Sequence, residues 1–186
     1  MSTNPIETTN KMKKPAPAAK GSGQSKNRKV SGYGKQLAEK QKAKEVYGLR
    51  ERQFANYVAK AAKKTGDTSK ILLAELESRL DNVVFRAGLA ATRAAARQMV
   101  SHGHILLNGR KLTVPSSVVK AGDEIKVSNR AKGRKGFETM PENLAKLEAP
   151  AWLTVNAKDV SAKVLNEPTV DMPAFDAKLI IEFYSR

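Results

Sequence analysis

The chain contains no cysteine among its 186 residues. It therefore can form no disulfide, no thiolate zinc site and no thiol nucleophile, and a reducing cytoplasm is its simplest location. It also lacks a run of about 18 apolar residues, the length that a membrane span requires, and its N-terminus carries no apolar signal core. We expect a soluble, unprocessed protein without a membrane partner.

Aromatic residues are scarce, at 5% of the chain, and no strand carries the aromatic pattern of single-strand RNA binders. Glycine-rich phosphate loops are also missing, since Gly133 to Gly136 fits neither nucleotide-binding pattern. If a nucleic acid is the partner, recognition of folded RNA by charge and shape is favoured over base stacking.

Positive charge is what the chain has in excess. The 34 Lys and Arg residues outnumber the 18 Asp and Glu residues, a formal net charge of +16. Residues 1–70 hold 17 basic and 5 acidic side chains, residues 71–130 hold 9 and 5, and residues 131–186 hold 8 and 8. A polyanion is the natural partner of the first two thirds, whereas the neutral last third suits packing or protein contacts.

The pattern along the chain begins with a basic, low-complexity arm over residues 1–30, which we expect to be disordered rather than a transit peptide. Helices are predicted over Lys35 to Tyr47 and Arg50 to Lys64. A third helix carries apolar residues from Leu72 to Val84 and stops near Gly88, and a fourth runs from a Thr92 cap to about Val100.

Short strands dominate the chain beyond this fourth helix. Asn108-Gly109 between two apolar runs predicts a β-hairpin, and Glu124 to Val127 reads as the next strand. After a Gly- and Lys-rich loop at Arg130 to Gly136, further strands are expected over Trp152 to Val155, Ala162 to Leu165 and Leu179 to Phe183.

Two pairs of arginines are the main candidates for phosphate contact. Arg93 and Arg97 are four residues apart, on one face of the fourth helix, where two guanidiniums can clasp adjacent phosphates. Arg79 and Arg86 share a face of the third helix with Asp81, a carboxylate better suited to orienting an arginine than to acid catalysis. A solvated face or local ion pairs is the alternative for each single arginine.

Catalytic and metal sites have little support. His102 and His104 form a His-x-His pair without the third or fourth ligand that a zinc site needs. Ser101, His102 and Asp123 could be arranged on paper as a triad, but no nucleophile elbow accompanies them. We expect no cofactor, no metal and no small-molecule substrate.

A family resemblance lies in SRLDNVVFRAGLAATRAAARQMVSHGHILLNGRKLTVPSSVVKAGDEIKV, residues 78–127. This segment closely resembles the RNA-binding module named for small-subunit ribosomal protein S-four. Residues 33–54 and 179–186 resemble the N-terminal helical domain and the C-terminus of that ribosomal protein, so the resemblance covers about 31–186. It departs at the start, where members usually carry a longer folded segment, sometimes with zinc-binding cysteines.

The resemblance implies a non-enzymatic, cytoplasmic component of the small subunit that binds the 5′ domain of its rRNA and nucleates assembly. It also implies contacts with neighbouring ribosomal proteins, a place where mRNA enters the subunit, and an influence on decoding accuracy. The match and the basic helices together assign RNA contact to Lys42, Lys44, Arg50, Arg52, Arg79, Arg86, Thr92, Arg93, Arg97, Gln98, His102, His104, Asn108 and Lys111.

The predicted fold is α+β. It combines the arm (1–30), a helical domain (31–78), an α/β RNA-binding module (79–143) and a C-terminal β-rich segment (144–186) that packs back on the other domains. Two alternatives remain: an RNA-modifying enzyme that carries the same module, which would need a separate catalytic domain, and a free RNA chaperone outside the ribosome.

Overall fold

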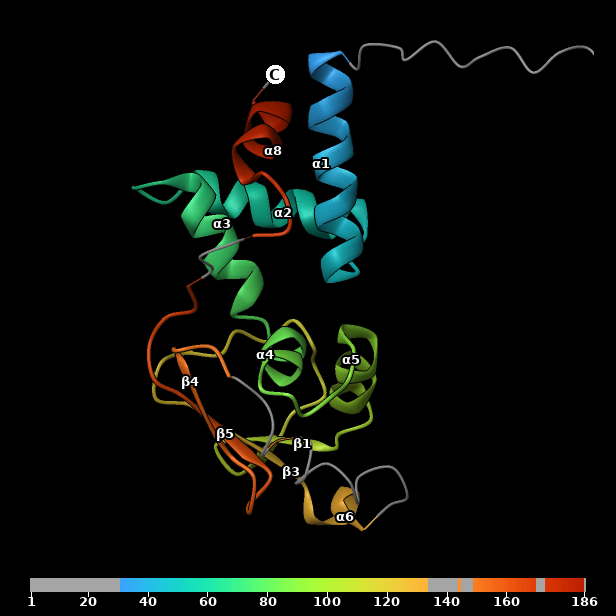
Figure 1. Cartoon of the computed structure of the whole chain (residues 1–186), viewed down its shortest axis with the longest axis vertical. Coiled ribbons are helices and arrows are strands. Elements are labelled where there is room, and N and C mark those ends of the chain that lie inside the picture. Colours follow the sequence, from blue (N-terminus) through green and yellow to red (C-terminus); the bar gives the residue numbers. More distant parts are fainter. Residues whose placement is uncertain (1–30, 134–143, 145–148, 170–172, 186) are drawn as a thin grey trace, which may run out of the picture. The chain divides into compact units, whose positions relative to one another are not determined.

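A computed structural model describes residues 31–133, 144, 149–169 and 173–185 (Figure 1). The predicted disordered arm over residues 1–30 lies outside these ranges. None of the described helices is long and apolar enough to cross a membrane.

Two helices open the described chain close to their predicted positions. Helix α1 spans Gly32–Tyr47, where the Ser31 hydroxyl accepts a hydrogen bond from the Gly34 amide and Gly48 ends the helix with a φ of 58°. Helix α2 spans Glu51–Ala62 and buries one face. The C-terminal helix α8 (Ala177–Tyr184) lies along α1 (Figure 1).

The predicted third helix is two helices, so this prediction was wrong. Helix α3 spans Thr68–Glu77 and helix α4 spans Leu80–Arg86. Arg79 between them is extended and forms a β-bridge with Val118, while the Leu80 amide donates to the Ser117 carbonyl. The apolar spacing continues across the break because both helices bury a face, but each face enters a different core.

A five-stranded antiparallel sheet forms the second half of the fold. Its order is β2-β1-β3-β5-β4, with β1 at Ile105–Leu107, β2 at Arg110–Lys111, β3 at Glu124–Val127, β4 at Leu153–Asn156 and β5 at Ser161–Val164. The predicted hairpin turn is confirmed, with φ of 49° at Asn108 and 78° at Gly109. The predicted loop at 130–136 begins instead with a helical turn, α6 at Asn129–Lys132, and its residues 134–136 lie outside the description.

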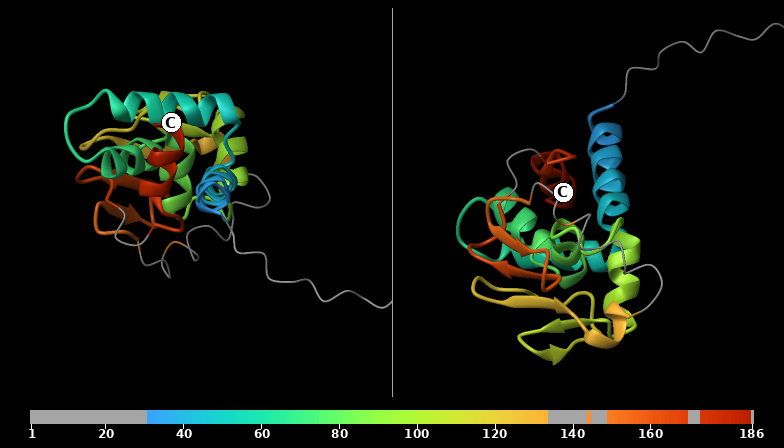
Figure 2. Two further views of the ribbon diagram at one scale, coloured as in Figure 1. Left: turned by 90° about the horizontal axis from the view of Figure 1, so that it is seen from above. Right: turned by 60° about the horizontal axis from the view of Figure 1, so that its bottom comes forward.

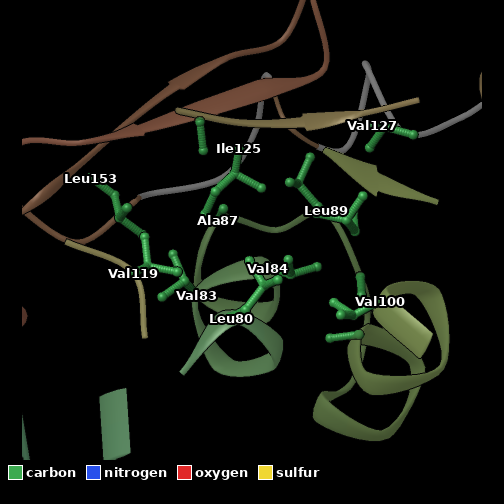
Figure 3. Close-up of a cluster of buried hydrophobic side chains, with 14 of the residues drawn as sticks. Leu80, Val83, Val84, Ala87, Leu89, Val100, Val119, Ile125, Val127 and Leu153 are labelled. Atoms are coloured by element: carbon green, nitrogen blue, oxygen red, sulfur yellow. The ribbon is translucent and has the colours of Figure 1, made fainter. Parts of the chain in front are cut away.

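Helices α4 and α5 (Arg93–Ser101) cover one face of this sheet. Figure 3 shows Val83 and Val84 of α4 and Val100 of α5 directed toward Ile125 and Val127 of β3. A second core lies among α1, α2, α3 and α8, built on Phe54, Leu72, Leu76 and Ile180.

The strand predicted over residues 179–183 is a helix, which is a second correction. Helix α8 spans Ala177–Tyr184, and the Asp176 carboxylate caps it by accepting from the Lys178 amide. Ala177, Ile180 and Tyr184 recur at helical spacing and pack in the core of α1 to α3. The β-branched Ile180 and Ile181 favour a strand locally, but burial against helices decides the conformation.

The segment predicted to be β-rich therefore divides between the two cores. Its strands β4 and β5 join the sheet next to β3, whereas α8 packs on the N-terminal helices. Helix α8 thereby brings the last described helix against α1 and α3.

Candidate nucleic-acid interface

The four candidate arginines gather where α3, α4 and α5 meet the end of α1. Thr92 caps α5 as predicted, its hydroxyl accepting from the Ala95 amide at 3.1 Å. The arginines converge on two buried carboxylates, Asp81 and Glu77, which are 2% and 1% exposed. We call these two carboxylates and the four arginines (Arg79, Arg86, Arg93 and Arg97) the arginine–carboxylate network.

Asp81 is the first centre of the network. Its two oxygens accept from Nε and Nη2 of Arg79 at 3.0 and 2.8 Å, a bidentate pair, and Oδ2 also accepts from Nε of Arg97 at 2.9 Å. The Arg79 guanidinium further donates to the Tyr57 hydroxyl on α2 at 2.8 Å. Asp81 thus orients two arginines, as predicted for a carboxylate in this position.

Glu77 is the second centre. Its carboxylate accepts from the Tyr47 hydroxyl at 2.7 Å, from the Asn82 amide at 2.6 Å and from Nε and Nη2 of Arg86, each at 2.9 Å. Arg93 lies farther away, with Nη2 at 3.9 Å from Oε1 of Glu77. Every partner donates a hydrogen bond or positive charge, so a buried anion is compensated on all sides.

Arg93 and Arg97 also bind groups outside the carboxylates. The Arg93 guanidinium lies 4.5 Å from the ring centroid of Phe85 and 5.1 Å from that of Tyr47, and its Nε donates to the Asn82 side chain at 2.8 Å. Arg97 donates to the backbone carbonyls of Tyr47 and Gly48 at 2.6 and 2.8 Å. A cation is thereby placed at the C-terminal end of α1, where the helix dipole favours it.

Gly48 is required at that contact for two reasons. Its φ of 58° suits glycine, and a Cβ there would lie 2.7 Å from Nη1 of Arg97. The close approach of Arg97 to α1 therefore depends on the absence of a side chain.

The pKa shifts agree with this geometry. Burial by itself would raise the pKa of Glu77, but hydrogen bonds from Arg86 and Tyr47 outweigh it and hold this pKa below its usual value. Burial raises the pKa of the Tyr47 hydroxyl, with a further contribution from Glu77. The network therefore holds an ionised Glu77 beside a neutral tyrosine at neutral pH.

The network limits what each arginine can offer to RNA. The Arg79 side chain is 5% exposed and is paired with Asp81. For this arginine the structure thus shows a local ion pair, which was the alternative to phosphate contact. The side chains of Arg86, Arg93 and Arg97 keep 33%, 21% and 32% exposure. Each of these three side chains is thus partly exposed while it also contacts groups within the protein.

The remaining candidates of the helical region are mostly on the surface. Lys42 lies exposed on α1, and Arg50 and Arg52 lie exposed at the start of α2. Lys44 instead pairs with Glu51 at 2.8 Å. The hydrogen bond from Lys44 is the main reason why the pKa of Glu51 falls to about 2.

In the module, Gln98, His102 and Lys111 are exposed and His104 is half-buried. The Lys111 side chain passes over Gly103, so closely that a Cβ at Gly103 would collide with Cε of Lys111. The two histidine rings meet edge to face at 5.8 Å.

Asn108 has a structural task in the hairpin. Its side-chain nitrogen Nδ2 donates to the Asp123 carboxylate at 2.8 Å, and its side-chain oxygen Oδ1 accepts from the Glu124 backbone amide at 2.9 Å. The side chain thus ties the turn to the start of β3.

In the described part of the chain, Ser101, His102 and Asp123 do not form a catalytic triad, and no metal cluster is present. The Ser101 hydroxyl donates to the Arg97 carbonyl at 2.8 Å, and Asp123 serves the Asn108 and Lys120 contacts. Within the described ranges, no three His, Asp or Glu residues lie together as metal ligands would.

Sequence reasoning missed the central role of Glu77 and the contributions of Tyr47, Tyr57 and Asn82. One signal was available, because Glu77 and Asp81 are the acidic residues among Arg79, Arg86, Arg93 and Arg97. The two tyrosines gave no such signal, since each lies more than 20 residues in the sequence from the residue that it contacts.

Comparison with known proteins identifies the family of this chain. Residues 78–125 match the S4 domain, and residues 2–77 match the ribosomal protein S4/S9 N-terminal domain. The chain is 46% identical to small ribosomal subunit protein uS4 of Roseiflexus castenholzii over 178 residues, covering 94% of this chain and 86% of the relative. The chain belongs to the uS4 family of small-subunit ribosomal proteins.

Other uS4 proteins are similarly close. Identity is 46% with uS4 of Chloroflexus aurantiacus strain J-10-fl, over 87% of this chain and 80% of the relative. It is 44% with uS4 of Syntrophomonas wolfei, over 88% of this chain and 79% of the relative.

Membership confirms the expected class: a ribosomal, RNA-binding protein of a non-enzymatic, cytoplasmic family. The alternative of an RNA-modifying enzyme is thereby dismissed. The match to the N-terminal domain begins at residue 2 and so includes the basic arm.

Proposed function

We propose that this chain is a primary rRNA-binding component of the small subunit, which binds the 5′ domain of the rRNA and helps nucleate assembly. The observation that carries the proposal is membership of the uS4 family over nearly the whole chain. The mechanism is architectural: cationic side chains displace counterions from the phosphates and hold the RNA in one fold.

The RNA face that we propose combines two exposed sets. On the helical side it consists of Lys42, Arg50 and Arg52, with Lys44 in a secondary place because Glu51 competes for it. On the module it consists of Gln98, His102, His104 and Lys111, with the exposed parts of the Arg86, Arg93 and Arg97 side chains. Thr92, Asn108 and Arg79 act indirectly, as a helix cap, a turn and an ion pair.

The arginine–carboxylate network gives this face its rigidity. Arg97 joins α5 to the end of α1, and Arg79 joins the start of α4 to α2. Since both contacts cross between the helical region and the module, the two basic sets keep one relative position. An RNA junction then meets a preorganised surface and loses less free energy in ordering it.

The finer parts of the proposal rest on the family resemblance. They are contacts with neighbouring small-subunit proteins, a position close to where mRNA enters the subunit, and an influence on decoding accuracy. The near-neutral charge of residues 131–186 supports protein contacts for that part of the chain.

The first experiment is a binding assay with a transcript of the small-subunit rRNA 5′ domain at moderate salt and excess tRNA as competitor. We expect binding that survives the competitor. Binding that tRNA abolishes would overturn the proposal and favour a free RNA chaperone. Co-sedimentation with small subunits through a high-salt gradient provides the second readout, since a free chaperone would be stripped away.

A further inference from the structure

The four arginines of the arginine–carboxylate network differ in how fully their guanidinium groups are hydrogen-bonded inside the protein. Arg79 and Arg97 each donate from all three nitrogens, Nε, Nη1 and Nη2. Arg86 donates from Nε and Nη2. Arg93 donates from Nε alone, and its Nη2 lies 3.9 Å from Glu77, beyond hydrogen-bond distance. Within the described ranges, both terminal amino groups of Arg93 therefore lack a hydrogen-bond acceptor.

These two amino groups are not buried. Among the described residues, Oε1 of Gln36 is the one buried side-chain nitrogen or oxygen that has no hydrogen-bond partner. Since Nη1 and Nη2 of Arg93 also lack such a partner there, they do not belong to the buried atoms, which agrees with the 21% exposure of this side chain. An acceptor from outside the chain can therefore reach them.

Two anchored aromatic rings lie beside the same guanidinium. Arg93 lies over the Phe85 ring at 4.5 Å and over the Tyr47 ring at 5.1 Å. Phe85 is half-buried against the core of the sheet, and Tyr47 is buried in the core of the N-terminal helices. Figure 2 (right) shows the C-terminal end of α1, where Tyr47 lies, next to α5. An arginine stacked on anchored rings loses less conformational freedom when it binds a ligand.

The charge of Arg93 is the least compensated of the four. The network holds four arginines against two carboxylates, a net charge of +2. The other three arginines form ion pairs of 2.8 or 2.9 Å, whereas the pair of Arg93 with Glu77 measures 3.9 Å. Burial accordingly lowers the pKa of Arg93, because Glu77 only partly offsets it. Arg93 is also the first residue of α5, whose first turn holds no acidic side chain, so the helix dipole adds to the positive potential.

We propose that Arg93 is the arginine of the network that binds an RNA phosphate, through its two terminal amino groups, and that Phe85 and Tyr47 are positioning residues for its guanidinium. Two parallel N–H donors match two phosphate oxygens in a bidentate contact. Arg97, predicted from its spacing to share this task, holds α5 to α1 instead. The inference rests on the proposed function, because it takes the anion to be the backbone of the rRNA.

The test is a double-mutant cycle in the full chain, with binding to the 5′-domain transcript measured as a function of salt concentration. Arg93→Gln should lower the slope of log affinity against log salt by about 0.7 to 0.9, the value for one phosphate. Phe85→Leu should weaken binding about 2- to 5-fold, as expected for a lost cation–π contact. In the Arg93→Gln background, Phe85→Leu should have no further effect, since a residue that acts through Arg93 has nothing left to position.

Conservative variants and a matched control complete the design. Phe85→Tyr keeps the ring and should bind as the wild type does. Arg93→Lys keeps the charge and should retain the salt slope, but it should bind more weakly because an ammonium group cannot form the bidentate contact. The control is Phe183→Leu, which removes a half-buried ring that lies over Lys40 at 4.3 Å, outside the proposed RNA face. It should leave rRNA affinity unchanged.

The outcomes separate the inference from the function on which it rests. If the wild-type chain shows no preference for the transcript over tRNA, the proposed function itself fails. If the wild type binds specifically but Arg93→Gln keeps its salt slope, only the phosphate contact of Arg93 is overturned. If Phe85→Leu weakens binding equally with and without Arg93, the positioning role of Phe85 is overturned.

Discussion

Glu77→Gln is the substitution that most directly tests the arginine–carboxylate network. It keeps the shape of the side chain and removes the charge, so no cavity forms. In the wild type, Glu77 is 1% exposed and accepts four hydrogen bonds from three side chains. After the change, Arg86 loses its anion, and one amide hydrogen of the new glutamine meets donors instead of acceptors.

The expected cost depends on burial. Removing one partner of a buried ion pair costs about 3 to 5 kcal/mol, because the other charge stays uncompensated. The Arg86 side chain is 33% exposed and can turn partly to water, which favours the lower end, about 3 kcal/mol. For a domain of this size, each kcal/mol lowers Tm by about 2 to 4 °C. Glu77→Gln should therefore lower Tm by about 6 to 12 °C at pH 7.

The matched control is Glu75→Gln, the same chemical change two residues earlier on α3. Glu75 is also buried, but its partners Lys60 and Lys64 have side chains that are 51% and 52% exposed. Pairs to such exposed lysines contribute about 1 kcal/mol or less. Thermal unfolding followed by circular dichroism should place Glu75→Gln within about 4 °C of the wild type.

The pH dependence adds an independent check. The pKa of Glu77 in the folded chain is below its unfolded value of 4.5. Its contribution to stability is therefore complete above pH 4.5 and is lost as the pH falls through the folded pKa. The difference in Tm between wild type and Glu77→Gln should shrink over that acidic range. A Glu77→Gln protein that melts no lower than Glu75→Gln at pH 7 would refute the reasoning.

Three further predictions concern the network, the RNA face and the hairpin. Arg97→Lys removes a guanidinium that binds Asp81 and two carbonyls at once, and urea unfolding should show a loss of about 1 to 3 kcal/mol; a stability equal to wild type would contradict the linking role. Lys42→Gln with Arg52→Gln should lower the salt slope of rRNA binding by about 1.4 to 1.8 without changing Tm, and an unchanged slope would exclude these residues from the RNA face. Asn108→Ala should cost about 1 to 3 kcal/mol, since alanine at a φ of 49° is strained and both side-chain hydrogen bonds disappear; urea unfolding at wild-type stability would show that the turn needs neither.

The elements that local chemistry specifies were predictable. Helices α1, α2 and α5 result from apolar spacing and from caps at Ser31, Thr92 and Gly48, all within a few residues of the helix they bound. The Asn108-Gly109 turn is equally local. The break at Arg79 was not predictable in this way, because its cause is pairing with residues 115–119, nearly 40 residues later.

The C-terminal helix illustrates the same limit. Residues 177–184 carry β-branched and aromatic side chains that suit either a strand or a helix. Their contact with α1 and α3, 100 or more residues earlier in the chain, selects the helix.

By itself, the sequence determined the chemical class of this protein. Its excess of Lys and Arg, its lack of cysteine and its family motifs are properties of composition and order, and they point to a ribosomal RNA-binding protein without further knowledge of the fold. Only the tertiary structure decided how each arginine is paired and how much of its side chain stays exposed. That outcome depends on burial and on partners such as Tyr47 and Glu77, which folding alone brings beside Arg86 and Arg93.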